Sequence, residues 1–334
     1  MSLCILRPGL LTTVQDLGRF GYQSDGIIVS GAMDARALRV ANRLVGNPET
    51  AAGLEITLLG PRIRFEADHL IALTGAHLSP TLNGQPVGLN RPVWVAAGTE
   101  LAFGPAGAGC RAYLAVAGGL AVPLVLGSRS TYLRAGLGGH EGRALRAGDT
   151  LPVGEASTIG EKLIRVLTRP GVAWAAAGFT PGPALCPRPR HRPVLRAVRG
   201  PEYGQFSAES QRAFWSEPFS ITPEADRMGY RLQGPPLVQL EQAELLSSAV
   251  TFGTVQVPAG GQPIVLGADR QTTGGYPRLA QVISADWPAL AQAAPGQPLW
   301  FREVSVAEAQ ALYAAREVAL AGLGRGIETV FSGQ

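Results

Sequence analysis

The chain has 334 residues, which at about 150 residues per domain suggests two domains, each with its own core. Its 43 glycines and 26 prolines accompany 46% hydrophobic residues, so we expect a globular, turn-rich chain and exclude a disordered one. Only 16% of the residues are charged, against about 25% in an average soluble protein. This low charge indicates either a lasting partner interface or a compositional bias of the source. The net charge of +4 comes without a basic cluster, so we expect no nucleic-acid partner.

Lysine is nearly missing from the sequence, because Lys162 is the one lysine among 29 basic residues. A phosphate-binding P-loop ends in Gly-Lys-Ser/Thr, and no such loop precedes this residue. A Schiff-base lysine or a biotinylated lysine would also have to be Lys162, which we predict to lie at the start of a strand. We therefore expect no Walker A site and no covalently attached biotin.

Cysteine and histidine spacings exclude two further kinds of site. The cysteines Cys4, Cys110 and Cys186 are far apart, and their odd number argues against a disulfide framework and for a reducing compartment. The four histidines show none of the short spacings of zinc ligands, so we expect no metal site. No signal peptide is expected, and the apolar run 112–126 is too short and too broken by Gly and Pro to span a membrane. We predict a cytoplasmic protein.

The first half contains one clear helix, and a run of predicted strands follows it. Apolar residues recur on one face over 33–45, which predicts a helix, with Ser30 or Asp34 as its N-cap. After this helix, short apolar runs alternate with Gly, Pro and Asn, which is typical of strands. The pair Asn83-Gly84 is a strong hairpin signal.

A proline-rich polar segment, 169–196, predicts a linker, because proline continues neither a helix nor a central strand. The predicted domains are therefore 1–168 and 197–334. The similar turn-plus-strand units that begin at Gly98, Gly148 and Gly296 are weak signs of related halves.

The second half consists of short strand candidates, each ended by turn residues. It closes with a predicted helix over 305–323, whose first turn carries a capping box of Ser305 and Glu308. Many short strands without regular βαβ alternation favour closed or sandwiched antiparallel sheets. The fold class is therefore predicted to be mainly β with a few helices, in two β-barrel-like domains.

The densest polar cluster of the first half lies among glycines and supplies our first site candidates. Glycines let backbone N–H groups approach an anion, and the arginine fork matches carboxylate or phosphate oxygens. The alternative is a long surface connection whose arginines are either solvated or paired with Glu141 and Asp149. The candidates for substrate binding are Ser128, Arg129, Ser130, Thr131, Tyr132 and Arg143.

A second polar, glycine-containing loop directly follows the apolar strand PIVLG. Loops at strand ends are usual places for ligand sites. Upstream, Asp226 and Arg227 repeat the Asp-Arg pair of this loop, and such a pair can equally well be structural. The candidates here are Arg227, Asp269, Arg270, Gln271, Thr272, Thr273 and Tyr276. We expect 128–132 and 269–276 to face each other across the domain junction. No G-x-S-x-G elbow is present, and we assign no catalytic residue.

Several long motifs resemble one family: TTVQDLGRFGY, SGAMDARALRVANRLVGNPETAAGLEI, GSRSTY, GGHEGRALRAGD, DRMGYRLQGP, GTVQVPAGGQPIVLGADRQTTGGYP and VISADWPALAQ. Together they are similar to the C subunit of the bacterial ATP-dependent 5-oxoprolinase, a family also described as urea amidolyase-related or biotin-dependent carboxyltransferase-like proteins. The likeness spans nearly the whole chain, and its weak stretch is the proline-rich segment.

The resemblance implies two cyclophilin-like β-barrel domains, as in the carboxyltransferase part of urea carboxylase. It also implies a cytoplasmic complex with two partners of the 5-oxoprolinase, a B-subunit-like protein and a LamB/YcsF-like A subunit. Such a complex would convert 5-oxo-L-proline to L-glutamate with ATP as co-substrate. Two alternatives share the same fold: a carboxyltransferase acting on urea or a related amide, and a non-catalytic regulator that binds a kinase-inhibitor-like homologue of the B subunit.

Overall fold

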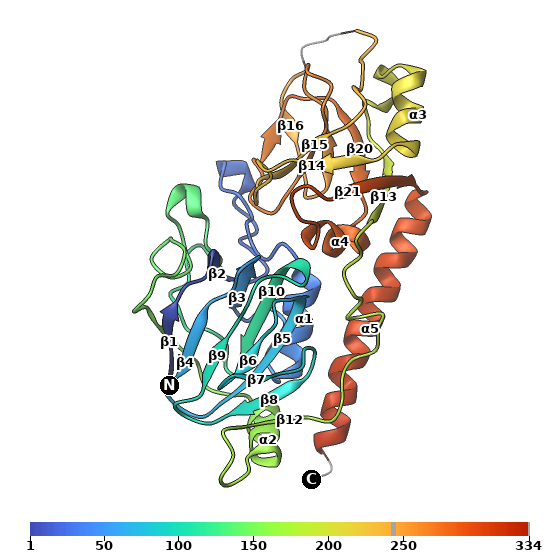
Figure 1. Ribbon diagram of the computed structural model, residues 1–334. Helices are drawn as coiled ribbons and strands as arrows, with labels where there is room; N and C mark the ends of the chain where they lie inside the picture. The colour runs from blue at the N-terminus through green and yellow to red at the C-terminus, as the bar shows by residue number, and fades with distance from the viewer. Residues whose placement is uncertain (242–244, 333–334) are drawn as a thin grey trace. The chain divides into compact units, whose positions relative to one another are not determined.

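The computed structural model describes residues 1–241 and 245–332, and it divides the chain into two compact units (Figure 1). Unit 1 comprises Met1–Arg19, Asp34–Arg188 and Arg316–Gln334, and unit 2 comprises Phe20–Met33 and Pro189–Ala315. These units differ from the predicted boundaries chiefly in two segments, since 20–33 groups with unit 2 and 316–334 with unit 1. Both assignments depend on contacts between residues far apart in sequence, which composition does not reveal.

Unit 1 is built on two antiparallel sheets of six strands each. The order in the first sheet is β11 (Thr150–Pro152), β1 (Ser2–Arg7), β4 (Arg62–Phe65), β9 (Glu100–Ala102), β6 (Thr81–Leu82) and β7 (Gln85–Pro86). The order in the second is β12 (Trp174–Ala176), β8 (Pro92–Val95), β5 (His69–His77), β10 (Ala108–Val116), β3 (Gly53–Thr57) and β2 (Leu11–Gln15).

The two sheets of unit 1 share one hydrophobic core. In β1 every second residue is buried, so Leu3 and Ile5 point inward, and Phe65 does the same from β4. The second sheet contributes Leu54 and Leu114 to the same cluster. Strict alternation in the first sheet therefore identifies its inner face, as expected for a sheet with one side against the core.

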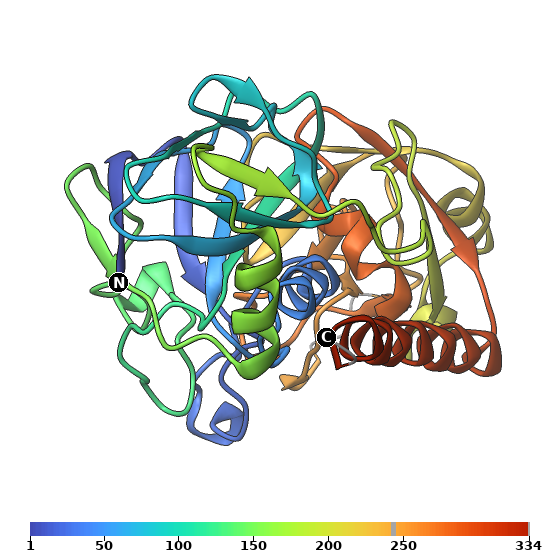
Figure 2. The same cartoon turned by 90° about the horizontal axis from the view of Figure 1, so that it is seen from below.

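Helices cover the other face of the second sheet in unit 1. Helix α1 (Ala35–Leu44) contacts β5 and β10, and α2 (Thr158–Leu167) contacts β5 and β8. Figure 2 shows these two helices lying beside the sheet strands that they contact. Leu44 of α1 and Leu163 of α2 share a buried cluster with Trp94 of β8. The predicted first helix is confirmed, and Asp34 is its N-cap, accepting a hydrogen bond from the backbone N–H of Ala37 at 2.9 Å.

The prediction that Lys162 begins a strand is wrong, because this residue lies inside α2. The helix begins after Ser157, whose side chain accepts a hydrogen bond from the backbone N–H of Gly160 at 3.1 Å. Leu163 and Leu167, four residues apart, are both buried on one helical face. The N-cap and this spacing outweigh the short apolar run that suggested a strand. Within the predicted linker, Trp174–Ala176 forms strand β12 and pairs with β8.

Unit 2 contains a closed barrel of seven strands. Around the barrel the order is β13 (Val194–Arg199), β20 (Arg278–Val282), β17 (Thr254–Gln256), β18 (Ile264–Leu266), β15 (Gly229–Gln233), β14 (Phe219–Ile221) and β21 (Pro298–Glu303). The parallel pairing of β21 with β13 closes it. A separate ladder joins β16 (Ser248–Ala249) to β19 (Thr273–Gly274). Within the described residues, closure leaves the barrel sheet without a free edge.

Aromatic side chains fill one part of the unit 2 core. Phe214, from α3 (Ala208–Ser216), stacks on Phe301 of β21 with ring centroids 4.4 Å apart. Phe219 of β14 also contacts both rings.

The remaining short elements of the two units are α4 (Trp287–Ala291) and the 3₁₀ turns Gln23–Asp25, Leu133–Ala135, Tyr203–Gln205 and Ser284–Asp286. The predicted fold class, mainly β with a few helices, is confirmed.

Two local predictions are also confirmed. Asn83 and Gly84 both have positive φ and connect β6 to β7, as a tight hairpin turn requires. The last helix, α5 (Val306–Ser332), begins where expected, with the Ser305 hydroxyl accepting from the backbone N–H of Glu308 at 3.1 Å. It continues past Leu323, the predicted end. Among the described residues, no helix combines the length and apolarity needed to cross a bilayer.

Candidate functional site

The serines of the first predicted site loop hold a buried carboxylate in unit 1. The Asp16 carboxylate accepts hydrogen bonds from the hydroxyls of Ser128, at 2.7 Å, and Ser130. It also accepts from the backbone N–H groups of Gly18, at 2.8 Å, and Arg129, at 2.6 Å. Ser128 and Ser130 are completely buried. Both hydroxyls donate their protons to Asp16 and have none left for a ligand, so the geometry favours a structural role for the two serines.

Further contacts tie this loop to strand β2. The Thr131 hydroxyl, completely buried, donates to the Val14 carbonyl at 2.9 Å. The Arg19 side chain is 1% exposed, and its Nη2 donates to the Ser130 carbonyl at 2.8 Å. The Nε of Arg129 donates to the Val122 carbonyl at 2.8 Å, which holds that guanidinium against its own loop. The loop is therefore rigidly attached to β2.

The other two candidates of unit 1 lie farther along the same loop. Tyr132 is half-buried and forms a backbone bridge with Leu137. Arg143 donates to both oxygens of Asp149, at 2.7 and 2.9 Å, and to Glu141 at 2.6 Å. The pKa of Asp149 is lowered to about 2, chiefly by its hydrogen bond from Arg143. This arrangement is the pairing that the sequence left open as an alternative to anion binding.

In unit 2, Arg227 and Asp269 form a buried ion pair. Arg227 Nε lies 2.9 Å from Asp269 Oδ2, and Nη2 lies 2.9 Å from Oδ1, with both residues less than a tenth exposed. Nη2 also donates to the Gly31 carbonyl at 2.6 Å, and the Ser30 hydroxyl donates to Asp269 at 2.8 Å. Ser30 is therefore not the helix cap, and its hydroxyl instead anchors the segment 20–33 to the end of β18.

The backbone beside this ion pair is tightly packed. A Cβ atom on Gly267 would lie 2.3 Å from the Arg227 carbonyl oxygen, a distance that real Cβ atoms do not reach. Only glycine therefore fits at the end of β18, where the chain passes the Arg227 backbone. This close approach fixes the direction in which Asp269 and Arg270 leave the strand.

Within the described part of the chain Arg270, unlike the adjacent Asp269, hydrogen-bonds to backbone carbonyls and not to an oppositely charged side chain. Its Nε donates to the Val250 carbonyl at 3.4 Å and its Nη1 to the Gly267 carbonyl at 3.3 Å. No carboxylate of the described residues forms an ion pair with it. Burial lowers the pKa of this guanidinium to about 10, a shift that nearby Asp269 opposes. Arg270 remains charged at neutral pH, and Nη2 and one N–H bond of Nη1 remain available for an anion.

The remaining candidates of this loop, which follow Arg270 in the chain, are neutral. Gln271 Nε2 lies 3.4 Å from Oε1 of the buried Gln256, whose own Nε2 donates to the Tyr276 carbonyl at 3.3 Å. The Thr272 carbonyl accepts from the Val250 N–H at 3.1 Å, while Thr273 is exposed in β19. The Tyr276 side chain is half exposed. The loop thus combines one partly buried cation with neutral hydrogen-bonding groups.

One buried polar network of unit 1 was missed by the sequence analysis. The hydroxyl of Tyr113, on β10, donates to Glu55 of β3 at 2.7 Å and accepts from the backbone N–H of Asp34 at 2.7 Å. Burial, followed by the nearby Glu55 charge, raises the pKa of Tyr113 well above its ordinary value. The available signal was a charged residue between Leu54 and Ile56 in an otherwise apolar strand.

The two predicted site loops lie in different units, so their meeting at a junction stays a prediction. The three cysteines are free thiols. Within the described part of the chain, no group of three or more His, Cys, Asp and Glu side chains is placed to hold a metal ion. Among the candidates, the Arg270 loop of unit 2 combines a partly buried cation with guanidinium N–H groups unused by the described residues, an arrangement that suits an anion.

A family model and the sequences of known proteins both match this chain over most of its length. Residues 25–303 match the family model "Carboxyltransferase domain, subdomain A and B". The chain is 45% identical over 307 residues to the C subunit of the Escherichia coli 5-oxoprolinase, covering 92% of this chain and 93% of that protein. It is 42% identical over 308 residues to the protein of the same name in Haemophilus influenzae, covering 92% and 93%.

A solved structure has the same fold. The crystal structure of the Kluyveromyces lactis urea carboxylase superposes with a TM-score of 0.86 at 29% sequence identity. The match covers 96% of this chain but only 29% of that much longer chain. The chain therefore belongs to the family of 5-oxoprolinase C subunits and contains carboxyltransferase subdomains A and B.

Proposed function

We propose that this chain is a subunit of an ATP-dependent 5-oxoprolinase, a complex that converts 5-oxo-L-proline to L-glutamate with hydrolysis of ATP. Two relatives named as the C subunit of 5-oxoprolinase share more than 40% identity with it over nine-tenths of its length. The observation that carries the site is Arg270, a partly buried cation whose hydrogen-bond partners among the described residues are two backbone carbonyls.

The chemistry of the substrate fits a site of this kind. 5-Oxoproline carries a carboxylate at neutral pH, and its five-membered lactam is an unreactive amide. Opening the ring requires activation, for instance by phosphorylation of the amide oxygen, which creates a further anionic group. A guanidinium fork binds either anion through two parallel hydrogen bonds, and such contacts strengthen where water is excluded.

The residues around Arg270 then have distinct tasks. Arg270 holds the anionic group, and the pair of Arg227 and Asp269 fixes the strand end from which Arg270 projects. Gln271 and Thr272 border the site with neutral donors and acceptors. We assign no catalytic residue.

The remaining parts of the reaction belong to the complex. The sequence has no Gly-Lys-Ser/Thr loop, so we propose that ATP binds with the help of a B-subunit-like partner and a LamB/YcsF-like A subunit in the cytoplasm. The single lysine, Lys162, lies within helix α2 of unit 1. We propose that this chain carries no covalently attached biotin and requires no metal of its own.

Reconstitution tests the proposal. The chain alone should form no glutamate from 5-oxoproline, whereas a mixture with both partners should form glutamate and consume ATP. The control mixture omits only this chain. Undiminished glutamate formation in that control would remove the chain from the reaction.

The likeness to urea carboxylase supports a second candidate, a carboxyltransferase acting on urea or a related amide. Such an activity would need carboxylated biotin carried by another protein. The same purified chain, supplied with a biotin carboxylase partner, bicarbonate and ATP, should not carboxylate urea if the 5-oxoprolinase proposal holds. Biotin-dependent carboxylation of urea would favour the second candidate.

A further inference from the structure

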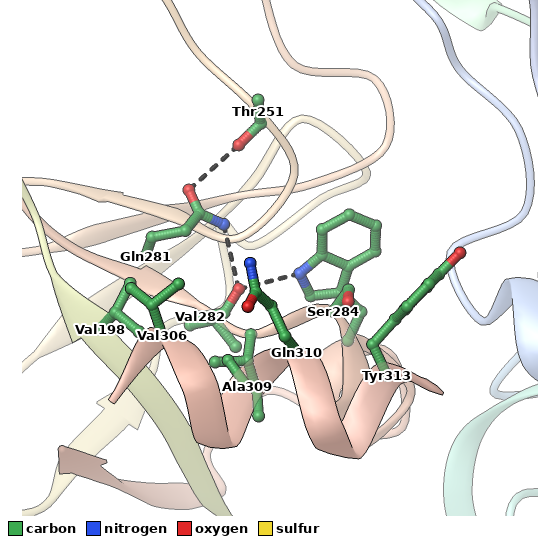
Figure 3. Close-up of a pocket in the computed structure, with 11 residues that line it drawn as sticks. Val198, Thr251, Gln281, Val282, Ser284, Val306, Ala309, Gln310 and Tyr313 are labelled. Atoms are coloured by element: carbon green, nitrogen blue, oxygen red, sulfur yellow. Dashed lines mark hydrogen bonds between the residues drawn. The ribbon is translucent and has the colours of Figure 1, made fainter. Parts of the chain in front are cut away.

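Unit 2 contains a pocket, and none of the residues that line it belongs to the Arg270 loop, 269–276. Its volume is about 510 Å³, within the range of small-molecule sites. One wall is the first part of α5, and the other is formed by β20 and the residues that follow it (Figure 3). Val306, Ala309, Gln310 and Tyr313 recur at helical spacing, so they share the face of α5 that lines the pocket.

The pocket walls are mainly apolar and carry no charge. Val198, Val282 and Trp287 line the side opposite α5. None of the lining residues, all of which lie in the described part of the chain, is charged. A charged ligand would lose water here without gaining an ionic partner, so the pocket favours a neutral ligand.

The polar groups of the barrel side are already engaged. Gln281 Nε2 donates to the carbonyls of Phe252, at 2.7 Å, and Val282, at 3.0 Å. Its Oε1 accepts from the hydroxyl of Thr251 at 3.0 Å, and Trp287 Nε1 donates to the Val282 carbonyl at 3.1 Å. These bonds, part of which Figure 3 shows, fix the wall and leave these donors little capacity for a ligand.

Gln310 differs from these groups. Its amide makes no hydrogen bond with any described residue, and Figure 3 shows it rising from α5 toward the strand that carries Gln281 and Val282. A primary amide presents an acceptor oxygen and a donor N–H in one plane. The pocket therefore combines uncharged apolar walls with one two-pronged hydrogen-bonding group.

We propose that this pocket binds a neutral ring compound with a cis-amide edge, such as a lactam or an imide. In such a ring the N–H and C=O lie side by side, so they pair with the oxygen and the N–H of Gln310, while the rest of the ring contacts Trp287 and the valines. This inference goes beyond the proposed function, because the pocket has no cation for the carboxylate of 5-oxoproline.

Binding of 2-quinolinone to the full-length chain, measured by isothermal titration calorimetry, tests the proposal. Its aromatic ring matches the apolar walls and its lactam matches Gln310. N-methyl-2-quinolinone lacks the N–H and should bind about tenfold more weakly, the effect of losing one hydrogen bond of about 1.4 kcal/mol. In Gln310→Leu the two compounds should bind equally. No measurable binding of 2-quinolinone, or the same preference in Gln310→Leu, would overturn the assignment.

A matched pair of substitutions tests the location. Ala309→Trp fills the pocket and should abolish binding, whereas Ala311→Trp, on an exposed position of the same helix that does not line the pocket, should leave it unchanged. Equal melting temperatures of the two variants exclude a folding defect as the cause of lost binding. Unchanged binding in Ala309→Trp would contradict the proposal, while 5-oxoprolinase activity is measured separately and tests the proposed function alone.

Discussion

Arg227 and Asp269 face each other through two parallel hydrogen bonds of 2.9 Å, although 42 residues separate them in the chain. The next residue, Arg270, has no such carboxylate partner among the described residues. The two adjacent loop residues therefore differ in their electrostatics. Asp269 forms a buried ion pair with no net charge, whereas Arg270 presents a positive charge. This contrast supports the proposal that Asp269 is structural and that Arg270 binds the anion.

The ion pair predicts a large effect on stability when one partner is removed. Asp269→Asn leaves the buried Arg227 charge uncompensated and should lower the free energy of unfolding by about 3–5 kcal/mol. Urea denaturation of the purified chain measures this loss. The double variant Arg227→Met with Asp269→Leu should lose less, since it buries no unpaired charge. A loss below about 1 kcal/mol in Asp269→Asn would argue against a buried pair.

The close approach at Gly267 gives a second stability prediction. Gly267→Ala should lower the free energy of unfolding by about 1–3 kcal/mol, because its Cβ meets the Arg227 carbonyl at 2.3 Å. Gly260→Ala is the matched control, since nothing lies within 4 Å of the added Cβ there. Equal denaturation midpoints for the two variants would contradict tight packing at the end of β18.

Low pH should weaken the loop that Arg143 and Asp149 hold together. The pKa of Asp149 is lowered from its ordinary value of 3.8 to about 2, so its contribution to stability is present above pH 3.8 and is lost as the pH falls toward 2. In Arg143→Ala the Asp149 pKa should rise toward its ordinary value, as NMR titration of the carboxyl carbon can show. An unchanged pKa in this variant would rule out Arg143 as the cause.

Local patterns predicted much of the fold, because the decisive signals were close in sequence. Turn residues bounding short apolar runs identified strands such as β18, and Ser305 with Glu308 identified the start of α5. Helix α2 was missed because its short apolar run, taken without Ser157, is equally typical of a strand. Strand β12 was missed because prolines surround it, while its pairing with β8 is a distant contact.

The candidate site was less predictable than the fold for a related reason. The sequence identified the polar loops but did not show which polar groups satisfy one another. Ser128 and Ser130 are bonded to Asp16, more than 110 residues earlier, and Tyr113 is bonded to Glu55, 58 residues earlier. Such pairings depend on which strands become neighbours. Only once they are known does Arg270 stand out as a cation that no carboxylate of the described residues pairs with.

Assembly with a B-subunit-like partner is a further expected result. The low charged fraction of the sequence favours a lasting interface, and co-expression should yield a complex that survives size-exclusion chromatography at micromolar concentration and moderate salt. Separate elution of the two proteins under these conditions would count against both the proposed role in the enzyme and the regulatory alternative.

Replacing Arg270 with lysine tests the central claim most directly. Arg270→Lys keeps a positive charge but loses the planar fork, so glutamate formation by the reconstituted complex of this chain and its two partners should fall by about 10² to 10³ while the melting temperature of the chain stays nearly unchanged. The matched control is Arg302→Lys, at an exposed arginine of the same unit whose partner Glu308 lies 3.5 Å away, and it should retain full activity. Full activity of the Arg270→Lys complex would contradict the account, as would a loss of activity accompanied by a melting temperature lowered by many degrees.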